Sequence, residues 1–310
     1  MLSEHLSAEL SERLGGAAIS ELCRLSGGAS RETWSFVASA KDGVARRLVL
    51  RRDPPAGLTR GMPMERELLI AARSAGVPVP QVVDADDTSL ILEHIEGETI
   101  PRRILRDDDF AGARAALAAS AGEALAGIHR LPLEKLGPAM PKKDDFEQYL
   151  ATLHGLPTPY PLFELAFRLL AQKRPPATAS TVVHGDFRLG NLIVDRGGLR
   201  AVLDWELAHV GDPLEDLGWF CVKAWRFGSA FPAGGVGSYD EFVGAYERVS
   251  GREVDRDALR WWEAFGTLRW GVICAVQASL HLSGALRSVE LAAIGRRVCE
   301  VESDLLGYLR

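Results

Sequence analysis

The chain has 310 residues, a length at which a single hydrophobic core is close to its limit, so we expect two lobes. Charged residues make up 25% and hydrophobic residues 47% of the chain, which excludes a disordered protein. The net charge of −6 argues against nucleic acid or an anionic membrane as a general partner. Because residues 1–5 carry neither a basic segment nor an apolar run, we expect no secretory signal and a cytoplasmic protein.

The N-terminal third has the pattern of a small sheet with helices. Leucines at positions 6, 10 and 14 have the spacing of one helix face and predict a leading helix near residues 4–14. Residues 62–74 have helical composition, and the following Gly-Val-Pro-Val-Pro run at 76–80 ends that helix. The strands expected are residues 19–24, 33–37, 47–52 and 90–95. We predict a five-stranded antiparallel sheet with one helix over about residues 19–95.

A glycine- and serine-containing turn lies between the first two predicted strands. Gly27 and Gly28 would let the backbone approach a phosphate group closely, and Ser30 would add a hydroxyl donor. The motif alone is weak, because a Gly-Gly pair in a hairpin is usually only a turn.

The third predicted strand ends in two arginines, Arg51 and Arg52. Neighbouring residues on a strand point to opposite faces, so only one of them can face a cleft and hold nucleotide phosphates. The following helix offers Glu65 and Glu67 as acidic partners. A surface salt bridge, which contributes little to stability, is the alternative for any such pair.

The most informative segment is His184-Gly185-Asp186-Phe187-Arg188-Leu189-Gly190-Asn191, followed by Asp204-Trp205-Glu206. The apolar runs at 181–183, 192–194 and 199–203 predict strands around it, the last two joined by a turn. Asp186 is placed to accept a proton from an acceptor hydroxyl, while Asn191 and Asp204 offer the hard oxygens that Mg²⁺ prefers. Loop polar groups that merely cap turns are the alternative, which the flanking strands and the second acid argue against.

Nearby polar residues are assigned lesser roles. Glu206 is the candidate for a second metal contact. We expect His184 to hold the loop through its ring nitrogens, because Asp186 already supplies a base. Asp212 and Asp216 suit capping and loop anchoring better than chemistry. Further on, residues 270–282 are the most apolar stretch, too short to span a membrane, and predict a buried helix.

These motifs together resemble one superfamily. The motifs are L-S-G-G-x-S, V-L-R, R-E, G-V-P-V-P, H-G-D-F-R-L-G-N and L-D-W-E-x-A-x-x-G-D-P-x-x-D-L, between Leu25 and Trp219. They are similar to the aminoglycoside phosphotransferase and choline kinase superfamily, relatives of the protein kinases. The most similar branch includes the kinase-like domains fused to some acyl-CoA dehydrogenases.

The resemblance implies an α+β, protein-kinase-like fold of two lobes. Residues 1–96 would form the small nucleotide-binding lobe and residues 97–310 the larger, mainly helical lobe with the catalytic loop and acceptor pocket. Asp186 would be the catalytic base, with Asn191 and Asp204 as magnesium ligands.

The resemblance also implies how the nucleotide is held. Arg51 would replace the phosphate-holding lysine of protein kinases, with Glu67 as its partner. The backbone carbonyl of Glu93 and the backbone N–H of Ile95 would hold the adenine. An arginine in place of lysine keeps the charge but presents a planar fork to the phosphates.

The expected activity is transfer of a γ-phosphate from ATP or GTP, with Mg²⁺, to a hydroxyl group of a small molecule. Two acceptor classes stay open: a hydroxyacyl-CoA-like metabolite, suggested by the most similar branch, and an aminoglycoside or choline-type amino alcohol. A kinase-like protein that binds nucleotide without catalysis is a further alternative, against which the intact Asp186, Asn191 and Asp204 argue. We expect a monomer or homodimer that binds neither nucleic acid nor membrane.

Overall fold

A five-stranded antiparallel sheet forms the N-terminal part of the chain, as predicted. The structure, a computed structural model, describes residues 2–25, 31–53, 61–136 and 140–309. The sheet has the strand order β1-β2-β3-β5-β4. Its elements in chain order are α1 (Leu2–Arg13), β1 (Ala18–Arg24), β2 (Glu32–Ser39), β3 (Ala45–Arg52), α2 (Met62–Ser74), β4 (Val82–Ala85) and β5 (Ser89–Glu93).

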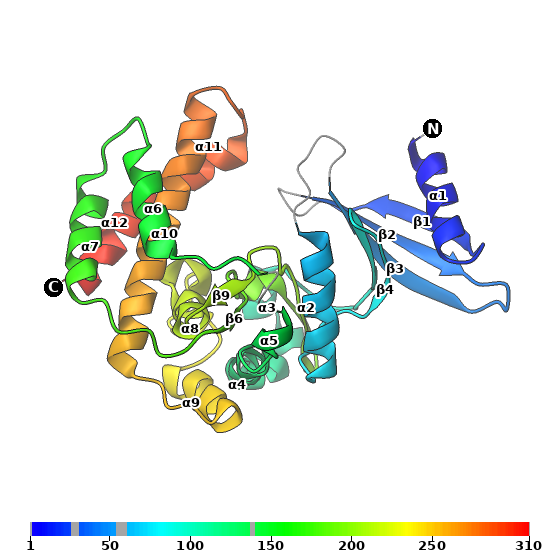
Figure 1. Ribbon diagram of the computed structural model, residues 1–310, viewed down its shortest axis with the longest axis horizontal. Helices are drawn as coiled ribbons and strands as arrows, with labels where there is room; N and C mark the ends of the chain where they lie inside the picture. The colour runs from blue at the N-terminus through cyan, green and yellow to red at the C-terminus, as the bar shows by residue number, and fades with distance from the viewer. Residues whose placement is uncertain (1, 26–30, 54–60, 137–139, 310) are drawn as a thin grey trace.

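The two helices of this part pack on opposite faces of the sheet. Leu6 and Leu10 of α1 are buried against one face, in a small core with Leu48, Leu50 and Ile91. Helix α2 lies between the sheet and the helical part of the molecule (Figure 1). Because side chains alternate along a strand, Leu50 faces α1 and its neighbour Arg51 faces α2.

The remainder of the described chain is mainly helical, with two short antiparallel strand pairs (Figure 1). Its helices are α3 (Pro101–Arg106), η1 (Asp108–Phe110), α4 (Ala111–Ile128), α5 (Leu133–Leu136), α6 (Asp145–His154), α7 (Pro161–Gln172), η3 (Leu189–Asn191), α8 (Leu214–Cys221), η4 (Lys223–Arg226), α9 (Tyr239–Ser250), α10 (Arg256–Leu282), α11 (Val289–Gly295) and α12 (Val298–Tyr308). Its strands are β6 (Thr181–Val183), which pairs with β9 (His209–Gly211), and β7 (Leu192–Asp195), which pairs with β8 (Gly198–Val202).

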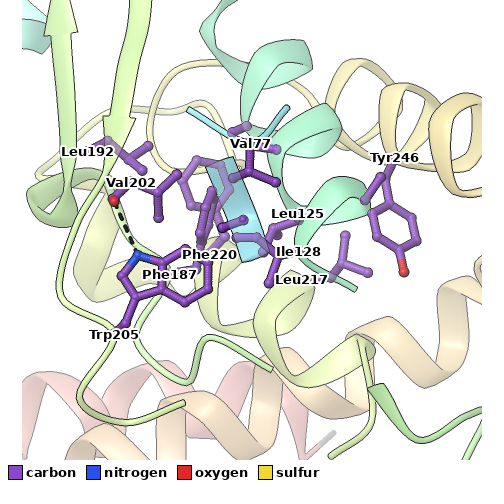
Figure 2. Packing of buried hydrophobic residues seen from close by; sticks show 14 of the residues in the cluster. Val77, Leu125, Ile128, Phe187, Leu192, Val202, Trp205, Leu217, Phe220 and Tyr246 are labelled. Atoms are coloured by element: carbon purple, nitrogen blue, oxygen red, sulfur yellow. Dashed lines mark hydrogen bonds between the residues drawn. The ribbon is translucent and has the colours of Figure 1, made fainter. Parts of the chain in front are cut away.

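The largest hydrophobic core joins α2 to the helical part and surrounds the β7–β8 hairpin. In it, Trp205 packs with Phe187 and Phe220, and its indole N–H donates to the Val202 carbonyl at 3.2 Å (Figure 2). The Ala-rich helix α4 approaches α9 so closely that a Cβ at Gly122 would lie 2.2 Å from the Phe242 carbonyl oxygen. This packing fixes the scaffold from which the 184–191 loop projects.

The chain passes from the sheet to the helical part after β5. Glu98 and Val194 exchange two backbone hydrogen bonds, at 2.8 and 3.0 Å, so this crossing segment lies beside β7. The lobe boundary expected between residues 96 and 97 stays a prediction.

The predicted buried helix over residues 270–282 is the second half of α10, and its burial is only partial. Val272, Cys274 and Ala275 are buried, but Leu282 is 81% exposed. The end of the helix therefore lies at the surface. Among the helices of the described residues, none is long and apolar enough to cross a membrane.

Candidate active site

A buried carboxylate of α8 holds the loop that follows β6. The backbone N–H groups of His184 and Gly185 donate to the two oxygens of Asp216, at 2.7 and 2.9 Å. Asp216 also faces the ring Nε2 of His129, at 3.0 Å. Gly185 has a φ of 84°, a left-handed conformation that favours glycine. The expectation that Asp216 anchors a loop is confirmed.

The charge state of Asp216 follows from these partners. Complete burial would raise the pKa of this carboxyl, but the hydrogen bond from His129 and the loop N–H of His184 outweigh burial and lower the pKa. Asp216 is therefore an anion at neutral pH and holds the loop through charge-assisted hydrogen bonds.

His184 also holds the loop, as expected from the sequence. Its Nδ1 accepts from the backbone N–H of Asp186 at 3.2 Å, and its Nε2 donates to the carbonyl of Leu203 at 3.0 Å. These partners require the neutral ring with the proton on Nε2. The histidine thus ties the loop to the end of β8.

The Asp186 carboxylate receives donors from three directions. Asn191 Nδ2 donates to Oδ2 at 2.7 Å, Trp219 Nε1 donates to Oδ1 at 2.8 Å, and Arg188 Nε lies 3.1 Å from Oδ2. The Arg188 guanidinium lies 5.1 Å over the Trp225 ring. The carboxylate is consequently fixed in orientation while its side chain keeps 16% of its surface exposed.

Sequence reasoning did not assign the contacts of Trp219 and Arg188 to Asp186. Arg188 follows Asp186 by two residues, and this proximity was the available signal. Trp219 comes from α8, more than thirty residues away, and is brought to Asp186 only by the packing of α8 against the loop.

A buried arginine of α10 supports the same loop. Arg269 donates to the Gly185 carbonyl and to Glu215, both at 2.9 Å. Its guanidinium also lies 4.5 Å over the Trp219 ring. It therefore positions both the loop backbone and the indole that contacts Asp186.

Asn191 and Asp204 flank the β7–β8 hairpin, which formed as predicted. The backbone N–H of Leu203 donates to the Asn191 carbonyl at 2.8 Å, so Asn191 lies opposite the residue before Asp204 at one end of the hairpin. Asp204 has a φ of 67°, in the left-handed region that few residues other than glycine adopt. Its Oδ1 accepts from Arg51 Nη2 at 3.0 Å, a contact between the sheet and the helical part.

Of the two arginines at the end of β3, Arg51 faces this site. Its Nη1 donates to Glu65 Oε1 at 2.6 Å, in addition to its contact with Asp204. Burial alone would lower the pKa of Arg51, but Glu65 and Asp204 raise it, so the guanidinium stays charged. Arg52 points to the other face and donates to Glu32 at 2.8 Å.

The expected partner of Arg51 was wrong: Glu65 occupies that position, not Glu67. Glu65 is buried and shares a helix face with Leu68, Leu69 and Ala72, at the spacings i+3, i+4 and i+7. Glu67 lies two residues further, about 200° around the helix, and faces solvent, where it pairs with Arg66. The apolar spacing was the sequence signal that could have distinguished them.

Glu93 and Ile95 lie at the end of β5, at the crossing between the two parts of the chain. A cavity of about 490 Å³ lies beside them, with walls from residues 77–79 and 93–96 and the side chains of Arg73, Asp195 and Arg200. Its lining includes neither Asp186 nor Asp204. Gly27, Gly28 and Ser30 lie outside the described residues.

The predicted metal ligands offer oxygen donors of the right kind. No group of three or more His, Cys, Asp or Glu side chains that could hold a metal is found in the part of the chain that the structure describes. Mg²⁺ commonly takes only one or two carboxylates from a protein and completes its shell with phosphates and water. The Asp204 carboxylate supplies one such oxygen donor, and the Asn191 side chain, whose Nδ2 donates to Asp186, carries a second. Glu206 lies near Arg31, with Oε2 3.8 Å from the arginine Nε.

Comparison with known proteins decides the family. The model of the phosphotransferase enzyme family (APH) matches residues 21–262, which is most of the chain. The chain belongs to this family. The resemblance inferred from the motifs is thereby confirmed.

Relatives of this family member include two longer proteins. The present chain is 34% identical over 208 residues to acyl-CoA dehydrogenase family member 10 of Mus musculus, covering 60% of this chain and 19% of that protein. It is 29% identical over 294 residues to acyl-CoA dehydrogenase family member 11 of Homo sapiens, covering 80% of this chain and 35% of that protein. The chain thus spans about a third or less of the length of these curated relatives.

Solved structures share the fold. A Ralstonia eutropha protein assigned to the aminoglycoside phosphotransferases superposes with a TM-score of 0.76 at 22% identity, covering 99% of this chain and 98% of that one. The complex of APH(2")-IIia with GDP and kanamycin gives a TM-score of 0.68 at 16% identity, covering 97% and 99%. The predicted kinase-like fold, with a five-stranded sheet and a mainly helical remainder, is confirmed.

Proposed function

We propose that this phosphotransferase moves the γ-phosphate of ATP or GTP to a hydroxyl group of a small molecule, with Asp186 as the base. The observation that carries the proposal is the fixed Asp186 carboxylate. It is held by Asn191, Trp219 and Arg188, and its loop is joined through Leu203 to Asp204, which contacts Arg51. A set of backbone and side-chain contacts thus links Asp186 and Asn191 to Asp204 and Arg51, and this linkage supports the proposal.

The proposed chemistry needs little covalent participation by the protein. Asp186 accepts the proton of the acceptor hydroxyl, whose oxygen forms a bond to the γ-phosphorus. The bond between that phosphorus and the oxygen bridging to the β-phosphate breaks, and the nucleoside diphosphate leaves with the electron pair. Arg188, which lies beside the carboxylate, is placed to offset the negative charge of the transferring group.

Arg51, Asp204 and Asn191 would hold the nucleotide end of this reaction. A bound Mg²⁺ would neutralise charge on the β- and γ-phosphates, with Asp204 and Asn191 as its protein ligands. Arg51 would exchange its contact with Asp204 for the phosphates while keeping Glu65. The GDP complex and a streptomycin–ATP complex of two structural neighbours support a nucleotide, and leave both ATP and GTP as candidates.

For the acceptor, we favour a hydroxyacyl-CoA-like metabolite over an amino alcohol. The longer relatives carry the name of acyl-CoA dehydrogenases. In the part of the chain that the structure describes, the side chains that contact the Asp186 carboxylate are Arg188, Asn191 and Trp219, and no second carboxylate is among them. A polycation such as an aminoglycoside needs several carboxylates in one pocket to offset its desolvation. The alternative has support from neighbours that include a kanamycin complex and a choline/ethanolamine kinase family protein.

Nucleotide consumption by the purified chain tests this proposal. Hydroxyacyl-CoAs, kanamycin and choline would each be supplied with ATP or GTP, with and without Mg²⁺, and the phosphorylated product would be identified by mass. We expect metal-dependent turnover of a hydroxyacyl-CoA. Turnover of kanamycin or choline alone would contradict the acceptor class. Nucleotide binding without any transfer would favour the non-catalytic alternative.

A further inference from the structure

Arg31, the residue before β2, is a buried cation close to the candidate site. Its side chain is only 2% exposed. The guanidinium pairs with Asp53, at 3.3 Å between Nε and Oδ1, and Nη1 donates to Glu65 Oε2. It also reaches toward the helical part, where Glu206 Oε2 lies 3.8 Å from Nε.

The two carboxylate oxygens of Glu65 therefore accept hydrogen bonds from two different arginines. Oε1 accepts from Arg51 at 2.6 Å, and Oε2 accepts from Arg31. The Glu65 side chain is 1% exposed. A carboxylate buried to this extent is held in one orientation only while both of its oxygens have charged partners.

We propose that Arg31 is a positioning residue for the nucleotide phosphates and acts through Glu65 on Arg51. The inference rests on the proposed function and adds a residue to it. Asp53 fixes Arg31, Arg31 fixes Glu65, and Glu65 fixes Arg51. If Asp204 held a metal ion, Arg51 would keep its hydrogen bond to Glu65.

The charge balance of the cluster supports the same inference. Two guanidiniums, Arg31 and Arg51, face four carboxylates: Asp53, Glu65, Asp204 and Glu206. Removal of Arg31 would increase the negative charge near the phosphates and leave one oxygen of Glu65 without this cation. Glu65 would then be free to reorient, and Arg51 with it.

The test compares Arg31→Met with Arg52→Met by calorimetry of Mg–AMP-PNP binding. Arg52 is the matched control, since it forms an ion pair with Glu32 on the opposite face of the sheet. We expect Arg31→Met to raise the Kd on the order of tenfold with an unchanged stoichiometry, and Arg52→Met to leave both unchanged. An Arg31→Met protein with a wild-type Kd would overturn the inference. A merely structural role would lower the stoichiometry and leave the Kd alone, which would overturn it as well.

The route through Glu65 is tested by a double-mutant cycle. If Arg31 acts through Glu65, Arg31→Met should have little further effect on the Kd in a Glu65→Gln protein; additive effects would contradict the route. If Arg31→Met does not fold, Arg31→Lys serves instead: it keeps the charge but not the fork, and an intermediate Kd is expected. A wild-type chain that binds neither Mg–AMP-PNP nor Mg–GMP-PNP would refute the proposed function, whereas normal binding in both wild type and Arg31→Met would refute only the role of Arg31.

Discussion

At the residue scale, Asp186 takes its orientation from neighbours supplied by separate segments. Asn191 lies in the same loop, but Trp219 comes from α8, and Arg269 of α10 stacks on that indole. The residue types of the loop could be read from the sequence because they lie within eight positions. The Trp219 contact could not, since it depends on how α8 and α10 pack.

Trp219→Phe tests this contribution directly. Phenylalanine keeps much of the ring packing but removes the N–H that donates to Asp186 Oδ1. A hydrogen bond to a charged group contributes about 1.5–3 kcal/mol, so we expect kcat to fall roughly 10- to 100-fold with the nucleotide Kd unchanged. Steady-state kinetics and calorimetry measure the two quantities.

Trp261→Phe provides the control for that variant. Its indole N–H also makes a hydrogen bond, to the Leu170 carbonyl at 2.9 Å, but it lies in the core between α7 and α10. We expect its kcat to equal that of the wild type. Equal losses in both variants would show that the Trp219 effect is general destabilisation.

At the element scale, the sequence predicted which segments form but not always which face they present. The bounds of α2 and the β7–β8 hairpin agree with the prediction, because proline, glycine and apolar runs mark their ends. The motif predicted Glu67 as the partner of Arg51, but the apolar spacing of α2 places Glu65 on the buried face and Glu67 on the exposed one. Residues 270–282 of α10 were predicted to be buried, but Leu282 is exposed. Composition alone does not show which part of an apolar helix is covered by other elements.

A buried ion pair joins β9 to α8 and makes the stability of this region depend on pH. His209 places Nε2 3.1 Å from Glu215 Oε2 and Nδ1 3.0 Å from the Leu207 carbonyl, so both ring nitrogens face acceptors. Burial would lower the pKa of His209, but the hydrogen bond and charge of Glu215 outweigh burial and raise it above 6.5. Folding therefore favours the imidazolium form of His209 relative to the unfolded chain.

The sign of the pH effect follows from that shift. A raised pKa in the folded state stabilises the fold fully below the unfolded value of about 6.5, and the contribution is lost as pH rises through the folded pKa. We expect the difference in unfolding free energy between wild type and His209→Gln to shrink from pH 6 to pH 9 in urea titrations. A difference that is constant or grows over this range would contradict the charged state of His209.

At the scale of the whole molecule, the proposed site lies where the sheet meets the helical part. Arg51 of β3 contacts Asp204 after β8, and Arg31 lies near Glu206. The sequence motifs identified the family and the fold, because their order along the chain is specific. The contacts across the two parts, which set the geometry of phosphate binding, are long-range and had to come from the structure.

Asp186→Asn tests the central proposal most directly, by comparing phosphate transfer with nucleotide affinity in one protein. The substitution keeps the shape of the side chain and removes the base. We expect transfer to the acceptor to fall by about 10²–10⁴-fold while the Kd for Mg–AMP-PNP stays at the wild-type value. Asp195→Asn, at the last residue of β7, is the matched control and should retain full transfer. Near-wild-type transfer by Asp186→Asn would contradict the role of Asp186 as the base.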